Sequence, residues 1–278
     1  MSLEGKVAFI TGAARGQGRS HAVRLAEEGV DIIGVDALTG YDTIAYPMGS
    51  REELDETVQL VEKQGRRMIA TEADVRYLAS LESAVAAGVE EFGRLDIVAA
   101  NAGISPPGTP LWQLPPQEWQ DVIDVNLTGV FNTLRASVPH MLEAGNGGSI
   151  VITSSGAGLK AVQNLADYNS SKFGVIGLGK TAANELAPYK IRVNMICPST
   201  VATPMVLNDA LYRLFRPDLE NPTVDDAAEV FTQMNPLGEP WADPVDISNA
   251  VVWLCSEQAR TVTGIVLPVD LGVSNKAL

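Results

Sequence analysis

The segment Thr11-Gly12-Ala13-Ala14-Arg15-Gly16-Gln17-Gly18 follows an apolar run, Lys6 to Thr11, and precedes a stretch of helical periodicity that begins near Gln17. Glycines in such a turn let a pyrophosphate approach the backbone, because they lack Cβ atoms. The free N–H groups and the positive end of the helix dipole then stabilise its charge. The order of strand, glycine turn and helix therefore predicts a dinucleotide site that contains Gly12, Arg15, Gly16, Gln17 and Gly18.

The same alternation of apolar runs and helical stretches continues along the chain. Seven runs are candidate strands: Lys6 to Thr11, Asp31 to Val35, Met68 to Thr71, Leu95 to Ala99, Ser149 to Thr153, Arg192 to Ile196 and Ile265 to Val269. Runs without polar alternation are typical of a parallel sheet buried on both faces, and right-handed crossovers place helices on each side. We therefore predict the α/β class: one Rossmann-type domain over residues 1–278, with a doubly wound, parallel, seven-stranded sheet.

The composition is that of a globular chain with an acidic surface. Hydrophobic residues make up 46% of the 278 residues, and 34 carboxylates against 20 lysines and arginines give a net charge of −14. Such a surface repels nucleic acid and anionic lipid headgroups. No apolar run approaches the roughly 20 residues of a membrane span, and the N-terminus lacks the apolar stretch of a secretory signal. We expect a soluble, cytoplasmic protein that binds neither nucleic acid nor membrane.

Cysteine and histidine are too sparse for a disulfide framework or a metal site. Cys197 and Cys255 are solitary, and His21 and His140 have no companions at ligand spacing. Free cysteine is among the most buried residue types. We therefore expect two core thiols, two structural histidines and no metal.

Asp36 ends the second apolar run, about 20 positions after the glycine turn. A carboxylate there accepts hydrogen bonds from both ribose hydroxyls of NAD and repels the 2′-phosphate of NADP. Arg15 is a contrary signal, because a guanidinium can pair with that phosphate. Since Ala37 supplies no second cation, the sequence predicts NAD. Asp74 and Val75, after the third run, are predicted to border the adenine ring.

Tyr168 and Lys172 are four residues apart, which places both side chains on one face of a helix. A neighbouring ammonium stabilises phenolate over phenol, so we expect the pKa of Tyr168 to fall below the usual value of about 10. Tyr168 is then a candidate general acid/base.

Further polar residues follow strand candidates or interrupt apolar runs. Ser154-Ser155 comes at the end of the fifth run, Asn101-Ala102-Gly103 at the end of the fourth, and Asn126 interrupts the run Val122 to Phe131. The carboxyl ends of strands in an open α/β sheet line the crevice where ligands bind. A buried amide such as that of Asn126 needs hydrogen-bond partners. These residues are therefore predicted to gather around the same crevice.

With these motifs the chain resembles the short-chain dehydrogenase/reductase superfamily from Lys6 to about Gly272. The resemblance rests on Thr-Gly-x-x-x-Gly-x-Gly at 11–18, Asn-Ala-Gly at 101–103, Asn126, Ser155 thirteen residues before Tyr168, Lys172, and Pro198 through Thr203. It implies a catalytic set of Asn126, Ser155, Tyr168 and Lys172. Ser155, chosen over Ser154 by its distance from the tyrosine, would hold the substrate oxygen, and Tyr168 would exchange its proton. Lys172 would bind the nicotinamide ribose, and Asn126 would retain a proton-relaying water.

The resemblance also implies which residues contact the cofactor. Besides the glycine turn, Asp36, Asp74 and Val75, they are Asn101, Ala102, Gly103, Tyr168, Lys172, Pro198, Val201 and Thr203, with Val201-Ala202-Thr203 at the nicotinamide carboxamide. The chain departs from the family at Pro198-Ser199, where Pro-Gly is usual. That departure concerns the shape of the turn and leaves the chemistry untouched.

Two aperiodic segments break the strand and helix pattern. Residues 37–49, the insertion loop, contain Tyr41-Asp42-Thr43-Ile44-Ala45-Tyr46-Pro47 and end at a Ser-x-x-Glu capping box, Ser50 with Glu53. Residues 203–243 carry several large apolar side chains and five prolines, four of them spread over positions 217, 222, 236 and 240, which is typical of a substrate lid or of a variable surface insertion.

The insertion loop and Cys-Pro-Ser-Thr-Val-Ala-Thr-Pro-Met at 197–205 resemble the mycofactocin-coupled, carveol dehydrogenase-like branch of the family. In that branch the insertion is taken to trap NAD so that it does not exchange, and electrons leave through the peptide-derived carrier mycofactocin. The alternative is a loop that only decorates the adenosine end of an enzyme with freely dissociating NAD.

The expected reaction interconverts a secondary alcohol and a ketone by hydride transfer to or from NAD. Apolar residues expected near the pocket indicate an apolar alicyclic or terpenoid substrate, or else belong to the core: Trp112, Met205, Tyr212 and Phe215. Two alternatives are an NADP-linked ketoacyl reductase, which Asp36 disfavours, and a non-catalytic dinucleotide-sensing regulator, which would not need the four catalytic residues. The family resemblance further implies a homotetramer.

Overall fold

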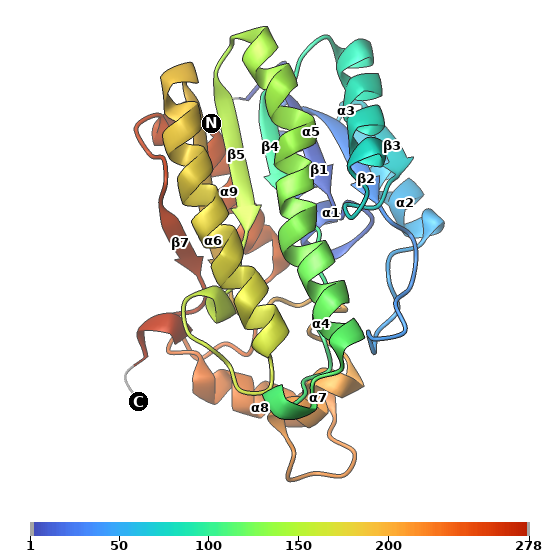
Figure 1. The fold of residues 1–278 in the computed structure, drawn as a ribbon, viewed down its shortest axis with the longest axis vertical. Coiled ribbons are helices and arrows are strands. Elements are labelled where there is room, and N and C mark those ends of the chain that lie inside the picture. Colours follow the sequence, from blue (N-terminus) through green and yellow to red (C-terminus); the bar gives the residue numbers. More distant parts are fainter. Residues whose placement is uncertain (1–2, 277–278) are drawn as a thin grey trace.

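A parallel sheet forms the centre of the molecule in a computed structural model that describes residues 3–276 (Figure 1). Its order is β3-β2-β1-β4-β5-β6-β7. The strands are β1 (Val7–Thr11), β2 (Asp31–Asp36), β3 (Met68–Glu72), β4 (Ile97–Ala100), β5 (Gly148–Thr153), β6 (Ile191–Pro198) and β7 (Val266–Val269). All adjacent pairs are parallel, which confirms the predicted fold class. The predicted domain 1–278 exceeds the described residues by two at each end.

Helices cover both faces of the sheet (Figure 1). One face carries α3 (Leu78–Phe92), α5 (Gly129–Ala144) and α6 (Ala166–Leu186), and the other carries α1 (Gly16–Glu27), α2 (Arg51–Lys63) and α9 (Pro244–Cys255). The strands are apolar at every position because both faces are buried. In β1, Val7 and Phe9 belong to the cluster under α3, α5 and α6, whereas Ala8 and Ile10 belong to the opposite cluster.

The insertion loop ends where the sequence predicts. Ser50 caps α2: its hydroxyl accepts a hydrogen bond from the Glu53 N–H at 3.2 Å, and the Glu53 carboxylate accepts one from the Ser50 N–H at 2.9 Å. This capping box is worth about 1 kcal/mol of helix stability. It fixes the position from which the loop runs back to the end of β2.

The predicted lid folds into two short helices beyond the carboxyl ends of the strands (Figure 1). These are α7 (Asp209–Phe215) and α8 (Val224–Met234), which pack through a small cluster of their own around Tyr212 and Phe231. The rings of Phe215 and Phe231 meet edge to face with centroids 4.8 Å apart.

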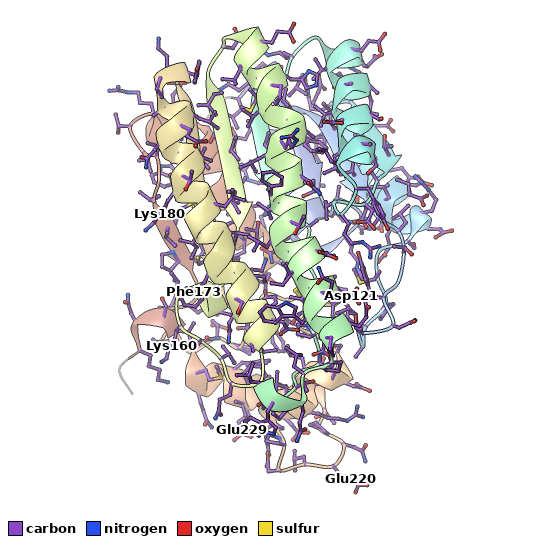
Figure 2. All side chains as sticks on the ribbon, viewed as in Figure 1. Asp121, Lys160, Phe173, Lys180, Glu220 and Glu229 are labelled. Atoms are coloured by element: carbon purple, nitrogen blue, oxygen red, sulfur yellow. The ribbon has the colours of Figure 1, made fainter. Side chains whose placement is uncertain are left out.

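A π-helical turn, Asp124–Thr128, joins α4 (Pro116–Ile123) to α5. Such turns widen the backbone and are frequent at functional sites. The outer surface of the neighbouring helices carries exposed aromatic side chains, including Phe131 on α5 and Phe173 on α6, each 47% exposed. Figure 2 shows Phe173 on the outward side of α6, on the same helix as Lys180.

Both cysteines are buried, as predicted, and His21 is buried as well. Within residues 3–276, no three acidic, histidine or cysteine side chains are grouped closely enough to hold a metal ion. In the same part of the chain no helix combines the length and the apolar character needed to cross a membrane.

Candidate active site

A cavity of about 450 Å³ opens at the carboxyl ends of the central strands. It brings together almost all residues that the sequence singles out: Gly12, Arg15, Gly16, Gln17, Gly18, Asp36, Asp74, Val75, Asn101, Ala102, Gly103, Ser155, Tyr168, Lys172, Pro198, Val201 and Thr203. Among the predicted catalytic and cofactor residues, Asn126 is the one that does not line the cavity. Residues from seven segments of the chain therefore meet at one site.

The glycine turn forms one end of the cavity and needs its glycines. Gly12 has a φ of +71°, which side chains rarely adopt. A Cβ on Gly18 would lie 1.9 Å from the carbonyl oxygen of Gly12. The first turn of α1 can therefore pack against the loop only with glycine at position 18, and its residues Gly16, Gln17 and Gly18 line the cavity.

Asp36 lies at the end of β2 beside this turn. One of its carboxylate oxygens, Oδ2, accepts a hydrogen bond from the Ala14 N–H at 3.0 Å. Burial raises the pKa of Asp36, while the N–H groups of Ala14 and Leu38 and the nearby Arg15 oppose that rise. The carboxylate keeps lone pairs for further donors, because an ionised carboxylate accepts about four hydrogen bonds.

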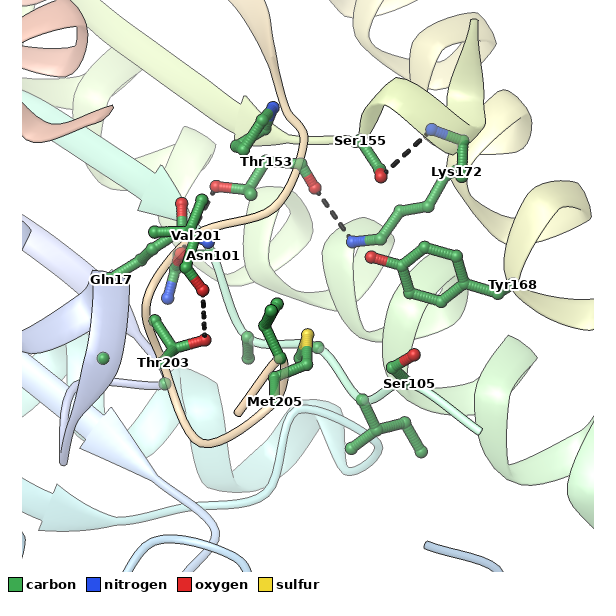
Figure 3. Close-up of a pocket in the computed structure, with 18 of the residues that line it drawn as sticks. Gln17, Asn101, Ser105, Thr153, Ser155, Tyr168, Lys172, Val201, Thr203 and Met205 are labelled. Carbon is green, nitrogen blue, oxygen red and sulfur yellow. Dashed lines mark hydrogen bonds between the residues drawn. The ribbon is translucent and has the colours of Figure 1, made fainter. Parts of the chain in front are cut away.

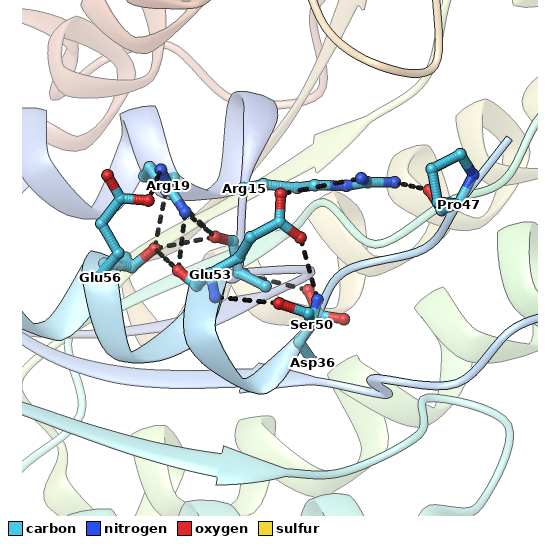
Figure 4. Close-up of polar contacts among 9 residues, drawn as sticks. Arg15, Arg19, Asp36, Pro47, Ser50, Glu53 and Glu56 are labelled. Atoms are coloured by element: carbon cyan, nitrogen blue, oxygen red, sulfur yellow. Dashed lines mark hydrogen bonds and ion pairs between the residues drawn. The ribbon is translucent and has the colours of Figure 1, made fainter.

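Arg15 contacts the insertion loop. Its guanidinium donates a hydrogen bond to the carbonyl oxygen of Pro47 and lies 3.8 Å from a carboxylate oxygen of Glu53 (Figure 4). Both contacts hold the cation between the loop and α2. The loop thereby closes over the end of β2.

Tyr168, Lys172 and Ser155 line the part of the cavity for which the sequence predicts the reaction. Figure 3 shows Tyr168 and Lys172 together on α6, with Ser155 facing them from beyond β5. The Lys172 ammonium nitrogen lies 5.5 Å from the centre of the Tyr168 ring and donates a hydrogen bond to the Thr153 carbonyl at 3.1 Å. The Ser155 hydroxyl is hydrogen-bonded to Tyr168.

The expected fall in the pKa of Tyr168 is wrong for this structure. Burial raises the pKa of Tyr168, and the Ser155 hydrogen bond lowers it by less. The same burial lowers the pKa of Lys172 to about 8. Removal of water penalises each charged form, and here that penalty exceeds the attraction between phenolate and ammonium.

The two serines at the end of β5 have different partners. The Ser154 hydroxyl is buried and donates to the carbonyl oxygen of Lys172 at 2.8 Å. The Ser155 hydroxyl accepts from the Ala157 N–H at 3.1 Å, caps a short 3₁₀ turn and reaches Tyr168. Ser154 thus fixes the backbone of α6, and Ser155 remains next to the phenol.

Asn126 lies behind the cavity wall, in the π-helical turn. Its side chain exchanges two hydrogen bonds with Ile104: Oδ1 accepts from the N–H at 2.8 Å and Nδ2 donates to the carbonyl at 2.9 Å. Position 103 is closely packed, since a Cβ there would lie 3.3 Å from Asn126 Oδ1 and 3.4 Å from Lys172 Nζ. The buried amide therefore fixes the loop after β4 close to Lys172.

Asp74 lines the cavity, and its carboxylate is already engaged by a neighbouring residue. Both of its carboxylate oxygens accept hydrogen bonds from Arg76, one from the backbone and one from the guanidinium. The Arg76 guanidinium in turn stacks over the ring of Tyr41, 4.7 Å from its centre. Tyr41 of the insertion loop is thereby placed at the cavity edge.

Two of the four apolar residues predicted for the substrate end lie elsewhere. Met205 and Phe215 line the cavity. Trp112 is 83% exposed, so it belongs neither to the cavity nor to the core. Tyr212 is buried in the small cluster of α7 and α8. Both residues lie in short helices within Pro-rich segments. A helix of so few residues has no apolar periodicity from which the inward-facing side could be predicted.

Several cavity residues carry no sequence signal that identifies them. The Thr153 carbonyl that holds Lys172 is a main-chain atom, and Ser105 and Tyr46 meet only through the tertiary fold. Tyr46 stands in the quoted insertion motif, but its position relative to the reacting end depends on the path of the loop. The only feature of the sequence that could have indicated Tyr46 as a cavity residue is that it is an aromatic residue within an aperiodic insertion.

Comparisons with known proteins agree with this geometry. The sequence model of the family described as Enoyl-(Acyl carrier protein) reductase matches residues 12–274. The chain is 50% identical over 274 residues to (-)-trans-carveol dehydrogenase of Rhodococcus erythropolis, with 99% of each chain covered.

Solved structures give the same result. Carveol dehydrogenase from Mycobacterium avium in complex with NAD has a TM-score of 0.97 at 53% identity, with 99% of each chain covered. A short chain dehydrogenase from Mycobacterium paratuberculosis bound to NAD has a TM-score of 0.90 at 41% identity, covering 99% of this chain and all of that one. With its parallel sheet, glycine turn and Ser-Tyr-Lys cluster, this chain belongs to the short-chain dehydrogenase/reductase family.

Proposed function

We propose that the protein is an NAD-dependent alcohol dehydrogenase that interconverts a secondary alcohol and a ketone. The observation that carries this proposal is one cavity with a glycine-cradled helix N-terminus at one end and Ser155, Tyr168 and Lys172 at the other. Phosphate binding and proton transfer are thus available within one connected space.

The cavity fits NAD in its charges and in its unpaired polar atoms. Asp36 would accept hydrogen bonds from the ribose hydroxyls, and Arg15 is already held by Pro47 and Glu53, which weakens the argument for a 2′-phosphate. Two buried side-chain atoms that line the cavity, Gln17 Oε1 and Ser199 Oγ, have no hydrogen-bond partner within the described residues. Buried polar atoms without partners are costly, so a polar ligand at this position stabilises them.

When bound, NAD supplies the hydride acceptor or donor. Ser155 holds the substrate oxygen, and Tyr168 takes the hydroxyl proton in the oxidation and returns it in the reduction. The Lys172 ammonium, anchored on the Thr153 carbonyl, holds the nicotinamide ribose and favours the phenolate of Tyr168. Asn126 retains a water that relays the proton outward.

The substrate end of the cavity favours an apolar alicyclic or terpenoid alcohol. Its walls include Met205, Val206, Leu211 and Phe215. Carveol dehydrogenases are among the relatives that resemble the chain over its full length, and this agrees with such a substrate. An apolar wall with few polar groups stabilises an alicyclic skeleton by removing it from water.

The insertion loop is proposed to retain NAD between turnovers, with electrons passing on to mycofactocin. Three contacts fix the loop: Arg15 with Pro47, Arg76 with Tyr41, and the Thr43 hydroxyl with a carboxylate oxygen of Asp121 at 2.7 Å. Ile44 and Tyr46 are buried. A loop packed in this way must open before a dinucleotide beneath it leaves.

The test measures the cofactor first and the reaction second. The purified protein is denatured, and the released nucleotide is identified by mass and absorbance; we expect NAD. Single-turnover reduction of the bound NAD by carveol is then followed at the absorbance of NADH. Release of NADP, or a preference for 3-oxoacyl thioesters, would favour a ketoacyl reductase instead. Retained NAD without turnover of any alcohol would favour a regulator.

We also propose a homotetramer in which helices pair between subunits. The exposed rings of Phe131 and Phe173 lie on α5 and α6, which cover the same face of the sheet, and Trp119 on α4 is 38% exposed. Apolar side chains grouped on one face of a water-exposed helix pair are typical of an interface. Figures 1 and 2 show both helices on the same face of the molecule.

A further inference from the structure

The insertion loop places a second phenol, Tyr46, in the reacting half of the cavity. Tyr46 is only 8% exposed, yet its side chain lines the same cavity as Tyr168. Its neighbours there include Ser105, Met205 and Leu211, which also border a smaller hollow beside it. A loop that closes the adenosine end of the site therefore also reaches the substrate.

The Tyr46 hydroxyl accepts one hydrogen bond, and its own proton is still available for donation. Its oxygen accepts from the Ser105 N–H at 3.0 Å. Nothing in residues 3–276 accepts the hydroxyl proton in return. Burial raises the pKa of Tyr46, and the neighbouring Tyr168 raises it further, so this phenol stays neutral and remains a donor.

Tyr46 is held in place before any ligand binds. The next residue, Pro47, is bound through its carbonyl by Arg15, and Thr43 is bound to Asp121 at 2.7 Å. Ile44 packs in the core between these two contacts. A donor fixed in this way loses little conformational entropy when it binds an acceptor.

We propose that Tyr46 is a specificity-determining residue that donates a hydrogen bond to a second oxygen of the substrate, an oxygen other than the one that reacts. The enzyme would accordingly prefer an alicyclic secondary alcohol that also carries a hydroxyl or carbonyl group. This inference rests on the proposed function, in which Ser155 and Tyr168 hold the reacting oxygen.

The arrangement of donors separates two oxygen positions. Ser155 is hydrogen-bonded to Tyr168, whereas no hydrogen bond joins Tyr46 to either residue in the part of the chain that the structure describes. Tyr46 and Tyr168 nevertheless line the same cavity. A substrate with one oxygen would leave the buried donor of Tyr46 unpaired, and such a loss discriminates against it.

The test compares alcohols that differ by one oxygen. Cyclohexanol and 1,2-, 1,3- and 1,4-cyclohexanediol are given to NAD-loaded wild-type protein and to Tyr46→Phe, which keeps the ring. We expect wild-type kcat/KM to be roughly 3- to 10-fold higher for at least one diol than for cyclohexanol, the effect of one neutral hydrogen bond. Tyr46→Phe should remove that preference and leave cyclohexanol within about twofold.

Tyr189→Phe is the control, because its phenol is 57% exposed and lies outside the cavity. The wild-type ratio should persist in this variant. Equal losses on diol and cyclohexanol in Tyr46→Phe would assign the residue to loop packing and overturn the inference. So would an unchanged diol preference in Tyr46→Phe, or a wild-type enzyme that prefers no diol.

A second measurement separates this inference from the proposed function. If wild-type protein oxidises neither carveol nor any of the four alcohols, the proposed function fails. The binding of the same alcohols is then measured by calorimetry on NAD-loaded protein. Tighter binding of a diol that is lost in Tyr46→Phe would still support the donor role, and equal binding would overturn it.

Discussion

At the scale of single residues, burial controls the chemistry of Tyr168 and Lys172 more than their mutual attraction does. Both groups are drawn toward their neutral forms by loss of water, so the phenol becomes less acidic and the ammonium less basic. Proximity on one helical turn is necessary for the proposed acid/base role. The protein alone does not make the phenol a strong base at neutral pH.

Alcohol oxidation should therefore accelerate as pH rises above neutrality. The reaction in this direction needs the phenolate of Tyr168, and a raised pKa shifts the phenolate fraction to higher pH. Ketone reduction needs the protonated phenol and should decline over the same range. Initial rates in both directions from pH 6 to pH 10 check this, and an oxidation rate that falls with pH would contradict it.

Replacement of Tyr168 by Phe should lower kcat by roughly 10²- to 10⁴-fold, the usual range for a general acid/base. The ring that lines the cavity remains, so NAD content after purification should equal that of the wild type. Turnover within a few fold of wild type would remove Tyr168 from the mechanism. A variant without NAD would show that the substitution had disturbed the site.

Replacement of Asp36 by Ala should weaken NAD binding and admit NADP. The substitution removes the acceptor for ribose hydroxyls together with the charge that repels a 2′-phosphate. It also leaves the Ala14 N–H without its partner, which loosens the glycine turn. Nucleotide titration of the emptied protein measures both effects, and an unchanged ratio of NAD to NADP affinity would exclude the ribose contact.

At the scale of elements, helices α1 and α9 are joined by a buried polar contact that depends on pH. The His21 ring nitrogen Nδ1 lies 2.8 Å from the Ser248 hydroxyl, and Nε2 has no partner within the described residues. Burial lowers the pKa of His21 from 6.5 to about 4. The folded protein therefore keeps this histidine neutral where the unfolded chain is protonated.

The sign of the effect on stability follows from that shift. A lowered folded-state pKa gives full stability above pH 6.5 and loses it as pH falls toward 4, by roughly 3 kcal/mol in total. The raised pKa values of the buried acids Glu118 and Asp167 act in the opposite direction. Denaturant unfolding of wild type and His21→Gln at pH 7 and pH 4.5 isolates the histidine, because the acids are common to both.

We expect His21→Gln to lose less stability than wild type between these two pH values. Equal losses in the two proteins would show that His21 is not the group responsible. The measurement also reports on the contact of α1 with α9, which supports the glycine turn from behind.

At the scale of the whole molecule, a net charge of −14 opposes association, while apolar rings on α5 and α6 favour it. The proposed tetramer requires the apolar contact to exceed the repulsion. Phe131→Asp adds a charge to that surface and should prevent the variant from assembling. Light scattering after gel filtration measures the mass, with Leu237→Asp, 73% exposed in the lid, as the control.

A monomeric wild type would contradict the tetramer directly. Dissociation by the control variant as well would indicate general charge repulsion instead of a defined interface. Added salt should strengthen the wild-type assembly, because it screens repulsion between like-charged subunits.

The positions of the strands and of the glycine turn along the chain could be predicted from the sequence, because these features depend on neighbouring residues. Continuous apolar runs specify buried strands, and Gly12 and Gly18 specify a turn whose geometry other residues cannot adopt. The spacing of Ser155, Tyr168 and Lys172 likewise relates residues that one strand end and one helix bring together. Periodicity and short spacing carry this information without knowledge of the remaining fold.

Only the tertiary structure decided the features that depend on distant segments. The Tyr46 hydroxyl accepts a hydrogen bond from the Ser105 N–H, 59 positions away in the sequence. The Lys172 ammonium donates to the main-chain carbonyl of Thr153, a contact that the side chain of residue 153 does not indicate. Trp112 lies outside the cavity because its short helix turns it to solvent. The direction of the Tyr168 pKa shift also depends on the tertiary structure. The shift is caused mainly by burial, and burial depends on all the segments that pack around the phenol.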